Sequence, residues 1–287
     1  MSAISQAIAV PLRRQRPARS ASALATLARR RAALTAANPR QILVPLLGPA
    51  ILALIVAPAL KVATGGLHSH KSHIDYQAFV GVGTVGLVVP LTCIFAGLSV
   101  IVDRHAGAQR ELLAAPVPRA FLVLGNLAVA LALATLQVVV LTSLAALRGA
   151  SFHITASGLG WFAAAALLFT VFMYGLAETV ASKINKEEEY IGATPALAIL
   201  PFFFAGALFP ISAMPGALTA IAKVLPLTHA LALLRYGFVD PSGKGLHDIW
   251  GMSNTTVEAW LSLAVVALFA AALTAISIRV FSRSAVS

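Results

Sequence analysis

An all-α integral membrane protein is the fold class that this 287-residue sequence predicts, on three observations. The mean hydropathy is +0.88. Only 11% of the residues are charged, against about a quarter in soluble domains. Six apolar stretches are long enough for helices that cross the hydrocarbon core, which takes about 20 residues. They are residues 41–60, 78–102, 120–147, 154–181, 191–211 and 259–278, and the alternating strands of a membrane barrel are absent.

The chain divides at residue 40 into a basic arm and a six-helix membrane domain, residues 41–287. The arm, residues 1–40, carries eight arginines and no acidic residue. Such an arm either binds nucleic acid or flanks a membrane span on the cytoplasmic side. Beside six spans the second interpretation is favoured, so no nucleic-acid partner is expected. A secretory signal is not expected either, because no small-residue cleavage site follows residues 41–60.

Residues 20–37 predict an amphipathic helix that lies along the inner membrane surface before the first span. Arg29 and Arg30 fall away from its apolar side. Arg31 falls on the apolar side, so its charged head is expected to snorkel to water. The apolar side carries Leu24, Leu27, Ala28 and Leu34.

The distribution of basic residues predicts that both termini lie in the cytoplasm. With the N-terminus inside, 15 of the 21 lysines and arginines fall in cytoplasmic segments and 6 in outer segments. An excess of this kind is what the positive-inside rule describes. The alanine-rich and arginine-rich composition points to a bacterial inner membrane. The single cysteine, Cys93, excludes an intrachain disulfide.

A proline-broken segment separates the fifth stretch from the sixth. Gly206, Pro210, Pro215 and Pro226 punctuate two apolar pieces that are too short to span, and Arg235 follows them. Proline interrupts a helix because it lacks an N–H and its ring clashes with the preceding turn. The segment therefore predicts a short re-entrant element on the outer face.

One run, residues 237–245, looks like a phosphate-binding loop but departs from that motif. Five residues instead of four separate its glycines, and Gly245 replaces the serine or threonine that would bind magnesium. The segment also lies outside the predicted membrane spans. We therefore expect this chain to bind no nucleotide of its own.

Three histidines at short spacing follow the first span. His68, His70 and His73 are residue types that bind zinc or copper. Only Asp75 stands near enough in sequence to complete a ligand set, so a solvated loop is favoured and no metal site is expected. Neither a Ser/His/Asp arrangement nor a carboxylate pair supports catalysis within the chain.

The segment between the second and third spans is the most informative polar one. Gly107 begins a short helix that carries Arg110 and Glu111, and Pro116 ends it before the basic residue Arg119. This construction presents a rigid polar helix at the membrane surface. Such a helix suits docking to a soluble partner.

At these residues the sequence resembles the permease subunits of type 2 ABC transporters, the daunorubicin-resistance and polysaccharide-export class. In that family the first cytoplasmic loop reads acid-Arg-Glu-x-Gly, followed at longer spacing by Pro, Arg and Gly. Those places hold Asp103, Arg104, Gly107, Pro116, Arg119 and Gly125, while His105 stands where many members have Glu. A second signature, Pro-apolar-Gly, Met-Pro, Pro-Leu-Thr and a distal Arg, is similar to residues 201–210, 214–215, 226–228 and Arg235.

The resemblance implies a non-catalytic transport subunit, the permease of an ATP-driven exporter of the multidrug type. Its implied partners are separate ATPase subunits that bind ATP and Mg²⁺, a second permease copy, and membrane lipids. The implied cargo is hydrophobic or amphipathic, a drug, a lipid-like molecule or a glycolipid. ATPase movements would be felt through the surface helix with Arg29, Arg30 and Arg31. They would also be felt through a coupling set of Arg104, Gly107, Arg110, Glu111, Pro116 and Arg119.

Glu178, near the inner end of the fourth stretch, is the one acid within a predicted span. An intramembrane acid is a functional candidate because burying its charge is costly. The alternative is a carboxylate that snorkels to water beside Lys183 and Lys186. Two other functions stay open: an ion-coupled secondary transporter, which would need Glu178, and a lipid-modifying enzyme with an outer histidine such as His153 or His229 as its base.

Overall fold

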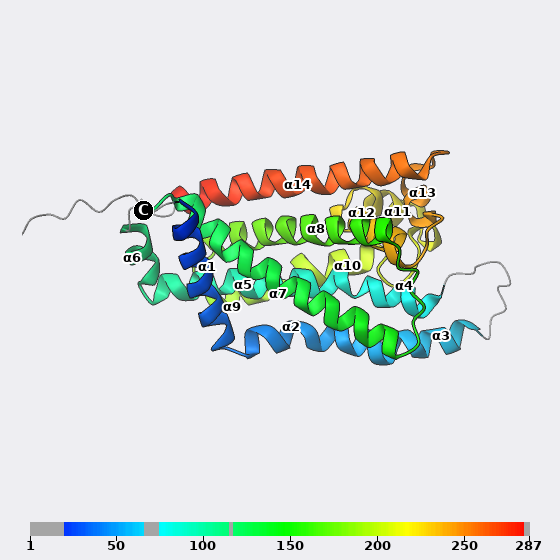
Figure 1. Ribbon diagram of the computed structural model, residues 1–287, viewed down its shortest axis with the longest axis horizontal. Coiled ribbons are helices and arrows are strands. Elements are labelled where there is room, and N and C mark those ends of the chain that lie inside the picture. Colours follow the sequence, from blue (N-terminus) through cyan, green and yellow to red (C-terminus); the bar gives the residue numbers. More distant parts are fainter. Residues whose placement is uncertain (1–19, 66–74, 115–116, 284–287) are drawn as a thin grey trace, which may run out of the picture.

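The computed structural model describes residues 20–65, 75–114 and 117–283, and every regular element within those ranges is helical. Five helices are long and apolar enough to cross a membrane, and a bent helix pair is a sixth candidate. The long helices run lengthwise beside one another (Figure 1). The chain is therefore a multi-pass membrane protein of the all-α class, as the sequence predicted.

The first two spans are each assembled from more than one helical segment. The first joins α2 (Arg40–Ile51), a π-helical turn (Leu52–Val56) and α3 (Ala57–Gly65). The second joins α4 (Tyr76–Gly83) and α5 (Val85–His105). Prolines lie inside α2 and α5, where they remove helical N–H donors, and neighbouring helices make this tolerable in a membrane.

Three uninterrupted spans complete the framework: α7 (Arg119–Leu147), α8 (Ala156–Lys183) and α14 (Thr255–Arg283). The central one is α8, which packs against α5, α12 and α14. Where α8 crosses α12, a Cβ atom on Gly237 would lie 2.5 Å from the carbonyl oxygen of Gly158. Only glycine lets the two backbones come this close, which is how small residues act in membrane helix packing.

The predicted fifth span, residues 191–211, differs in the structure. The chain forms α9 (Glu187–Gly192), a π-helical turn (Pro195–Ile199) and α10 (Leu200–Phe204), and then turns at Gly206, whose φ is 76°. A short 3-10 turn (Ile211–Ala213) follows, then α11 (Gly216–Val224), α12 (Pro226–Phe238) and α13 (Lys244–Trp250). The bend of 84° between α11 and α12 makes this pair the sixth candidate, in place of residues 191–211. Pro195 begins the π-helical turn and Pro201 lies in the first turn of α10. Proline has no N–H to donate, which explains why the helix is broken here.

The bundle has two chemically different ends. At one of them α1 (Ser20–Ala36) lies across the bundle beside α6 (Ala108–Ala114) and the last turns of α14 (Figure 1). We call this the α1 end, and the opposite end, with α11, α12 and α13, the α13 end. The α1 end carries Arg29, Arg30, Arg31, Arg40, Arg104, Arg110, Arg119, Lys183, Lys186 and Arg279. The α13 end carries Lys61, Arg148, Lys223, Arg235 and Lys244 among the described residues.

At the α13 end, Asp75 ties three segments together. Its carboxylate accepts hydrogen bonds from the backbone N–H groups of Gln77 and Ser151, and Nζ of Lys61 lies 3.3 Å from Oδ1. Burial by itself raises the pKa of this carboxyl, but the two backbone donors and Lys61 outweigh burial and the pKa lies below its ordinary value. Asp75 thereby caps α4 and holds the α7–α8 connection against it.

The outer surface of the first span, along α2 and the π-helical turn after it, is an apolar stripe. Leu43, Leu47, Ile51 and Ile55 follow one another at the four-residue spacing of a helix face, and each is more than half exposed. A soluble monomer rarely exposes so much contiguous apolar surface. Lipid tails or another membrane-embedded chain are the surroundings that fit this face.

Candidate functional site

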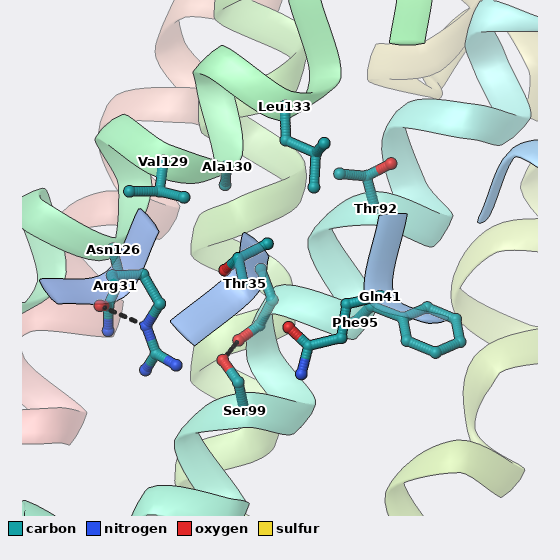
Figure 2. A pocket seen from close by; sticks show the side chains of 11 residues that line it. Arg31, Thr35, Gln41, Thr92, Phe95, Ser99, Asn126, Val129, Ala130 and Leu133 are labelled. Carbon is teal, nitrogen blue, oxygen red and sulfur yellow. Dashed lines mark hydrogen bonds between the residues drawn. The ribbon is translucent and has the colours of Figure 1, made fainter. Parts of the chain in front are cut away.

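A buried ion pair fixes α1 to the bundle. Arg31 is 6% exposed, and its Nη2 lies 2.8 Å from Oδ2 of Asp103, at the end of α5. Its Nε donates a hydrogen bond of 2.9 Å to Oδ1 of Asn126 on α7 (Figure 2). The Nη1 atom of Arg30 lies 3.7 Å from the same Asp103 oxygen. One carboxylate therefore holds two arginines of the surface helix.

The expectation that Arg31 snorkels to water is wrong. The apolar side of α1 packs on α7, so Arg31 points into the protein and a carboxylate neutralises it instead of water. The approach of the two helices is close: a Cβ atom on Gly125 would lie 3.1 Å from Cβ of Leu27. Arg29, predicted to face away, is exposed. The sequence pattern had singled out Asp103 as part of a motif but had not paired it with Arg31.

A small polar pocket lies next to Arg31, between α1, α2, α5 and α7 (Figure 2). Its volume of about 20 Å³ suits a single water molecule. Thr92 and Ser99 of α5 contribute hydroxyl groups to its lining. Deeper in the bundle, Thr92 donates to the side-chain carbonyl of Gln137, whose Nε2 donates to the backbone oxygen of Ile42 at 2.9 Å. Sequence reasoning had missed this chain of polar contacts, because isolated Thr and Gln residues give no periodic signal.

The predicted docking helix is α6, which packs one face against the protein and exposes the other. Gly107, with φ 75°, makes the left-handed turn between α5 and α6 that other residues rarely adopt. On α6, Arg110 and Glu111 are exposed, while Leu112 and Leu113 pack against the core. The helix therefore presents polar groups from a fixed base.

Two other members of the predicted coupling set have different surroundings. Arg104 points inward: its guanidinium donates to the backbone oxygens of Ala181 and Ile184, at 3.1 and 3.2 Å. These are carbonyls at the C-terminal end of α8, where a cation interacts favourably with the unpaired acceptors and the helix dipole. Arg119 is exposed at the first residue of α7, and Pro116 lies outside the described residues.

Glu178 is buried and does not snorkel. It is 0% exposed, its Oε2 accepts a hydrogen bond of 3.2 Å from Ser277 of α14, and within the described part of the chain its Oε1 has no hydrogen-bond partner. The hydroxyl of Tyr174, one turn earlier on α8, is buried as well and interacts with this carboxylate. Glu178 is also not the one acid within a span, because α14 begins earlier than predicted and includes the fully buried Glu258.

The predicted outer element also contains an unexpected interior residue. Arg235 had been counted among the outer basic residues, yet it is 8% exposed. Its Nη1 and Nη2 donate to the backbone oxygens of Gly206 and Ala207, at 2.9 and 2.7 Å, and its guanidinium carbon lies 3.4 Å above the ring centre of Phe79. Gly206 is thus the site of a backbone turn that Arg235 secures. The three prolines mark the starts of the short elements: the 3-10 turn follows Pro210, α11 follows Pro215, and α12 begins at Pro226.

The outer histidines have structural surroundings. Both ring nitrogens of His229 are engaged: Nε2 lies 3.0 Å from the Lys223 oxygen and Nδ1 lies 3.2 Å from Oγ of Ser262. His153 is exposed. Among residues 20–65, 75–114 and 117–283, no three His, Cys, Asp or Glu side chains gather in a metal-binding arrangement. The predicted solvated loop with His68, His70 and His73 lies outside the described residues.

These features define a helical multi-pass membrane protein with two polar helices, α1 and α6, at one end. Residues 22–239 match the protein family described as ABC-2 type transporter. The match covers well over half of the chain, so the chain belongs to that family and is the membrane component of such a transporter. Nodulation protein J of Sinorhizobium fredii is a similar protein, 23% identical over an alignment 192 residues long that covers 63% of this chain and 69% of the relative.

Proposed function

We propose that this chain is the permease of an ATP-driven exporter and that separate ATPase subunits bind and hydrolyse the ATP with Mg²⁺. Membership of the ABC-2 family supports a transport role. The observation that carries the coupling proposal is α6, where Arg110 and Glu111 are exposed on a helix whose partly buried Leu112 and Leu113 pack against the core. A helix that is packed against the bundle transmits the movement of a bound partner to the bundle, whereas a flexible loop does not.

Two neighbouring residues explain how movement of α6 would spread. Asp103 holds α1 through Arg30 and Arg31, and Arg104 holds the C-terminal end of α8. Both lie in the last turn of α5, three and four residues before Gly107. A displacement of α6 by an ATPase would therefore pull on α1, α5 and α8 together.

The proposed orientation has the α1 end and both termini in the cytoplasm of a bacterium, with the chain in the inner membrane. The richer supply of basic residues at the α1 end supports this orientation. It also brings α1 and α6 to the side where soluble ATPases are found.

We also include a second copy of the chain and a hydrophobic or amphipathic cargo in the proposal, a drug, a lipid-like molecule or a glycolipid. An apolar groove of about 370 Å³ lies between α2, α5 and the start of the broken fifth segment. Val44, Phe95, Leu98 and Ile191 contribute to its lining. With the exposed stripe of α2, this groove supports an interface at which a permeation path of apolar character would form.

The first test is a mild-detergent isolation of the tagged chain from its native membrane. We expect a soluble ATPase in stoichiometric amount and a permease dimer by light-scattering mass. Arg110→Ala and Glu111→Ala should each lower transport-coupled ATP hydrolysis without changing membrane insertion. Arg148→Ala, an exposed arginine at the α13 end, is the matched control. Full coupling in both α6 variants would refute the docking assignment, and repeated isolation of the chain without an ATPase would refute the exporter.

A further inference from the structure

A cavity of about 290 Å³ at the α13 end lies apart from the surfaces assigned above. It is close to the lower size limit of small-molecule sites, about 300 Å³. Residues of α4, α12, α13 and the turns around Gly206 and the 3-10 segment line it. Phe79, Ile211 and Ala232 form an apolar wall, and charged side chains gather around the rest. The lining thus combines an apolar surface that could contact hydrocarbon with charged side chains that could contact an ionic group.

Arg235 contributes an uncompensated positive charge to this cavity. Four hydrogen bonds from its five N–H groups go to backbone oxygens, including that of Phe79 at 3.4 Å, and no ion pair with a carboxylate is found for it within the described residues. Backbone oxygens satisfy most of its donors but do not cancel its charge. A buried cation without a counter-charge is costly, so a negative group in the cavity would stabilise it. Lys244, exposed at the start of α13, adds a second cation to the lining.

Negative charge is present as well, but on different elements. Asp240 follows α12 and Asp248 lies within α13, and both line the cavity. The Oδ2 atom of Asp248 accepts a hydrogen bond of 2.9 Å from Ser212. Thr228, 3% exposed, is another lining residue, and its buried hydroxyl has no hydrogen-bond partner in the described part of the chain. A simple anion would meet the repulsion of these two acids, and a simple cation would meet Arg235 and Lys244.

The depth of the cavity in the membrane follows from the aromatic residues around it. All three tryptophans of the chain, Trp161, Trp250 and Trp260, lie at the α13 end. The ring centres of Trp161 and Trp260 are 5.0 Å apart, and Trp161 is 6.0 Å from Tyr236, which lines the cavity. Tryptophan and tyrosine gather at the headgroup level of a bilayer.

We propose that this cavity binds the headgroup of a zwitterionic phospholipid from the leaflet at the α13 end. The phosphate lies toward Arg235 and Lys244, and the ammonium group lies toward Asp240 and Asp248. The apolar wall receives the first part of the hydrocarbon. Both signs of charge in the lining and the depth at the headgroup level agree with this one class of ligand.

The test compares two lipids on the purified full-length chain in detergent, with native mass spectrometry as the readout. Phosphatidylethanolamine carries both charges, and phosphatidylglycerol carries only the phosphate. We expect phosphatidylethanolamine to bind about fivefold more tightly, the scale of an exposed charge pair. Lys244→Ala should weaken both lipids, whereas Asp248→Asn should weaken phosphatidylethanolamine alone and narrow the ratio.

Lys223→Ala is the matched control, because Lys223 is an exposed lysine at the same end outside the lining. Arg235→Lys is expected to lose the Gly206 turn, so it is not a suitable test. The conclusion relies on Lys244→Ala and Asp248→Asn, the two rim variants, whose melting temperatures should equal that of the unchanged chain. Equal binding of the two lipids, or rim variants that behave like Lys223→Ala, would overturn the proposal. Neither result depends on an ATPase, so failure here is distinct from failure of the exporter assignment.

Discussion

The ion pair between Arg31 and Asp103 offers the sharpest energetic prediction. Removing one partner of a buried pair costs about 3–5 kcal/mol, because the remaining charge stays buried and unpaired. The Asp103 side chain is 17% exposed and Arg31 keeps its bond to Asn126, so we expect the lower limit, about 3 kcal/mol, for Asp103→Ala. Arg31→Met should cost a similar amount, since among the described residues the carboxylate then keeps only the 3.7 Å contact with Arg30.

The double variant Arg31→Met with Asp103→Ala should cost less than the sum of the two single changes. We expect a coupling energy of about 2 kcal/mol, within the range for residues in direct contact. Unfolding of the purified chain in mixed micelles, titrated with a denaturing detergent, measures all three values. Protease cleavage within α1 gives a second readout, because loss of the pair should release α1 before the bundle unfolds.

Arg29→Met is the matched control, because Arg29 is on the same helix and exposed. We expect it to change the free energy of unfolding by no more than about 0.5 kcal/mol. Additive costs for Arg31→Met and Asp103→Ala, or an Arg29→Met effect as large as theirs, would refute the ion-pair argument.

Three further predictions concern stability. Gly237→Ala should lower the free energy of unfolding by about 1–3 kcal/mol through overpacking against α8. Gly160 has open space around it, so Gly160→Ala should stabilise α8 by up to about 1 kcal/mol. Thermal unfolding in detergent compares the two variants, and equal effects would contradict the close crossing. Arg104→Ala should lower stability by about 1–2 kcal/mol through loss of its bonds to the α8 carbonyls, with Arg110→Ala as the neutral control in the same assay. The lowered pKa of Asp75 means that its contribution to stability is full above the ordinary aspartate pKa, near 4, and is lost as the pH falls through the folded-state value. Asp75→Asn removes the oxygen that accepts from Ser151 and the charge beside Lys61, so the variant should be less stable by about 1 kcal/mol at pH 7. Its melting temperature should also fall less steeply as the pH is lowered, and an unchanged profile would contradict this.

The sequence by itself determined the class of fold, because apolar character over about 20 residues is a local property that decides whether a segment can lie in lipid. The surface helix with Arg29–Arg31 and the polar helix with Arg110 and Glu111 were visible for the same reason, since turn residues and helical periodicity are local. Family membership followed from short motifs of this kind.

The tertiary structure decided which polar side chains meet. Arg31 and Asp103 are 72 residues apart in sequence, and no periodic pattern says that α1 turns its arginine toward α5. Packing likewise decided that Arg235 lies inside, that Glu178 is buried against α14, and that the fifth apolar stretch breaks into short helices. Hydropathy measures only the preference of a segment for lipid, whereas the partner of a buried charge depends on how the segments are arranged around one another.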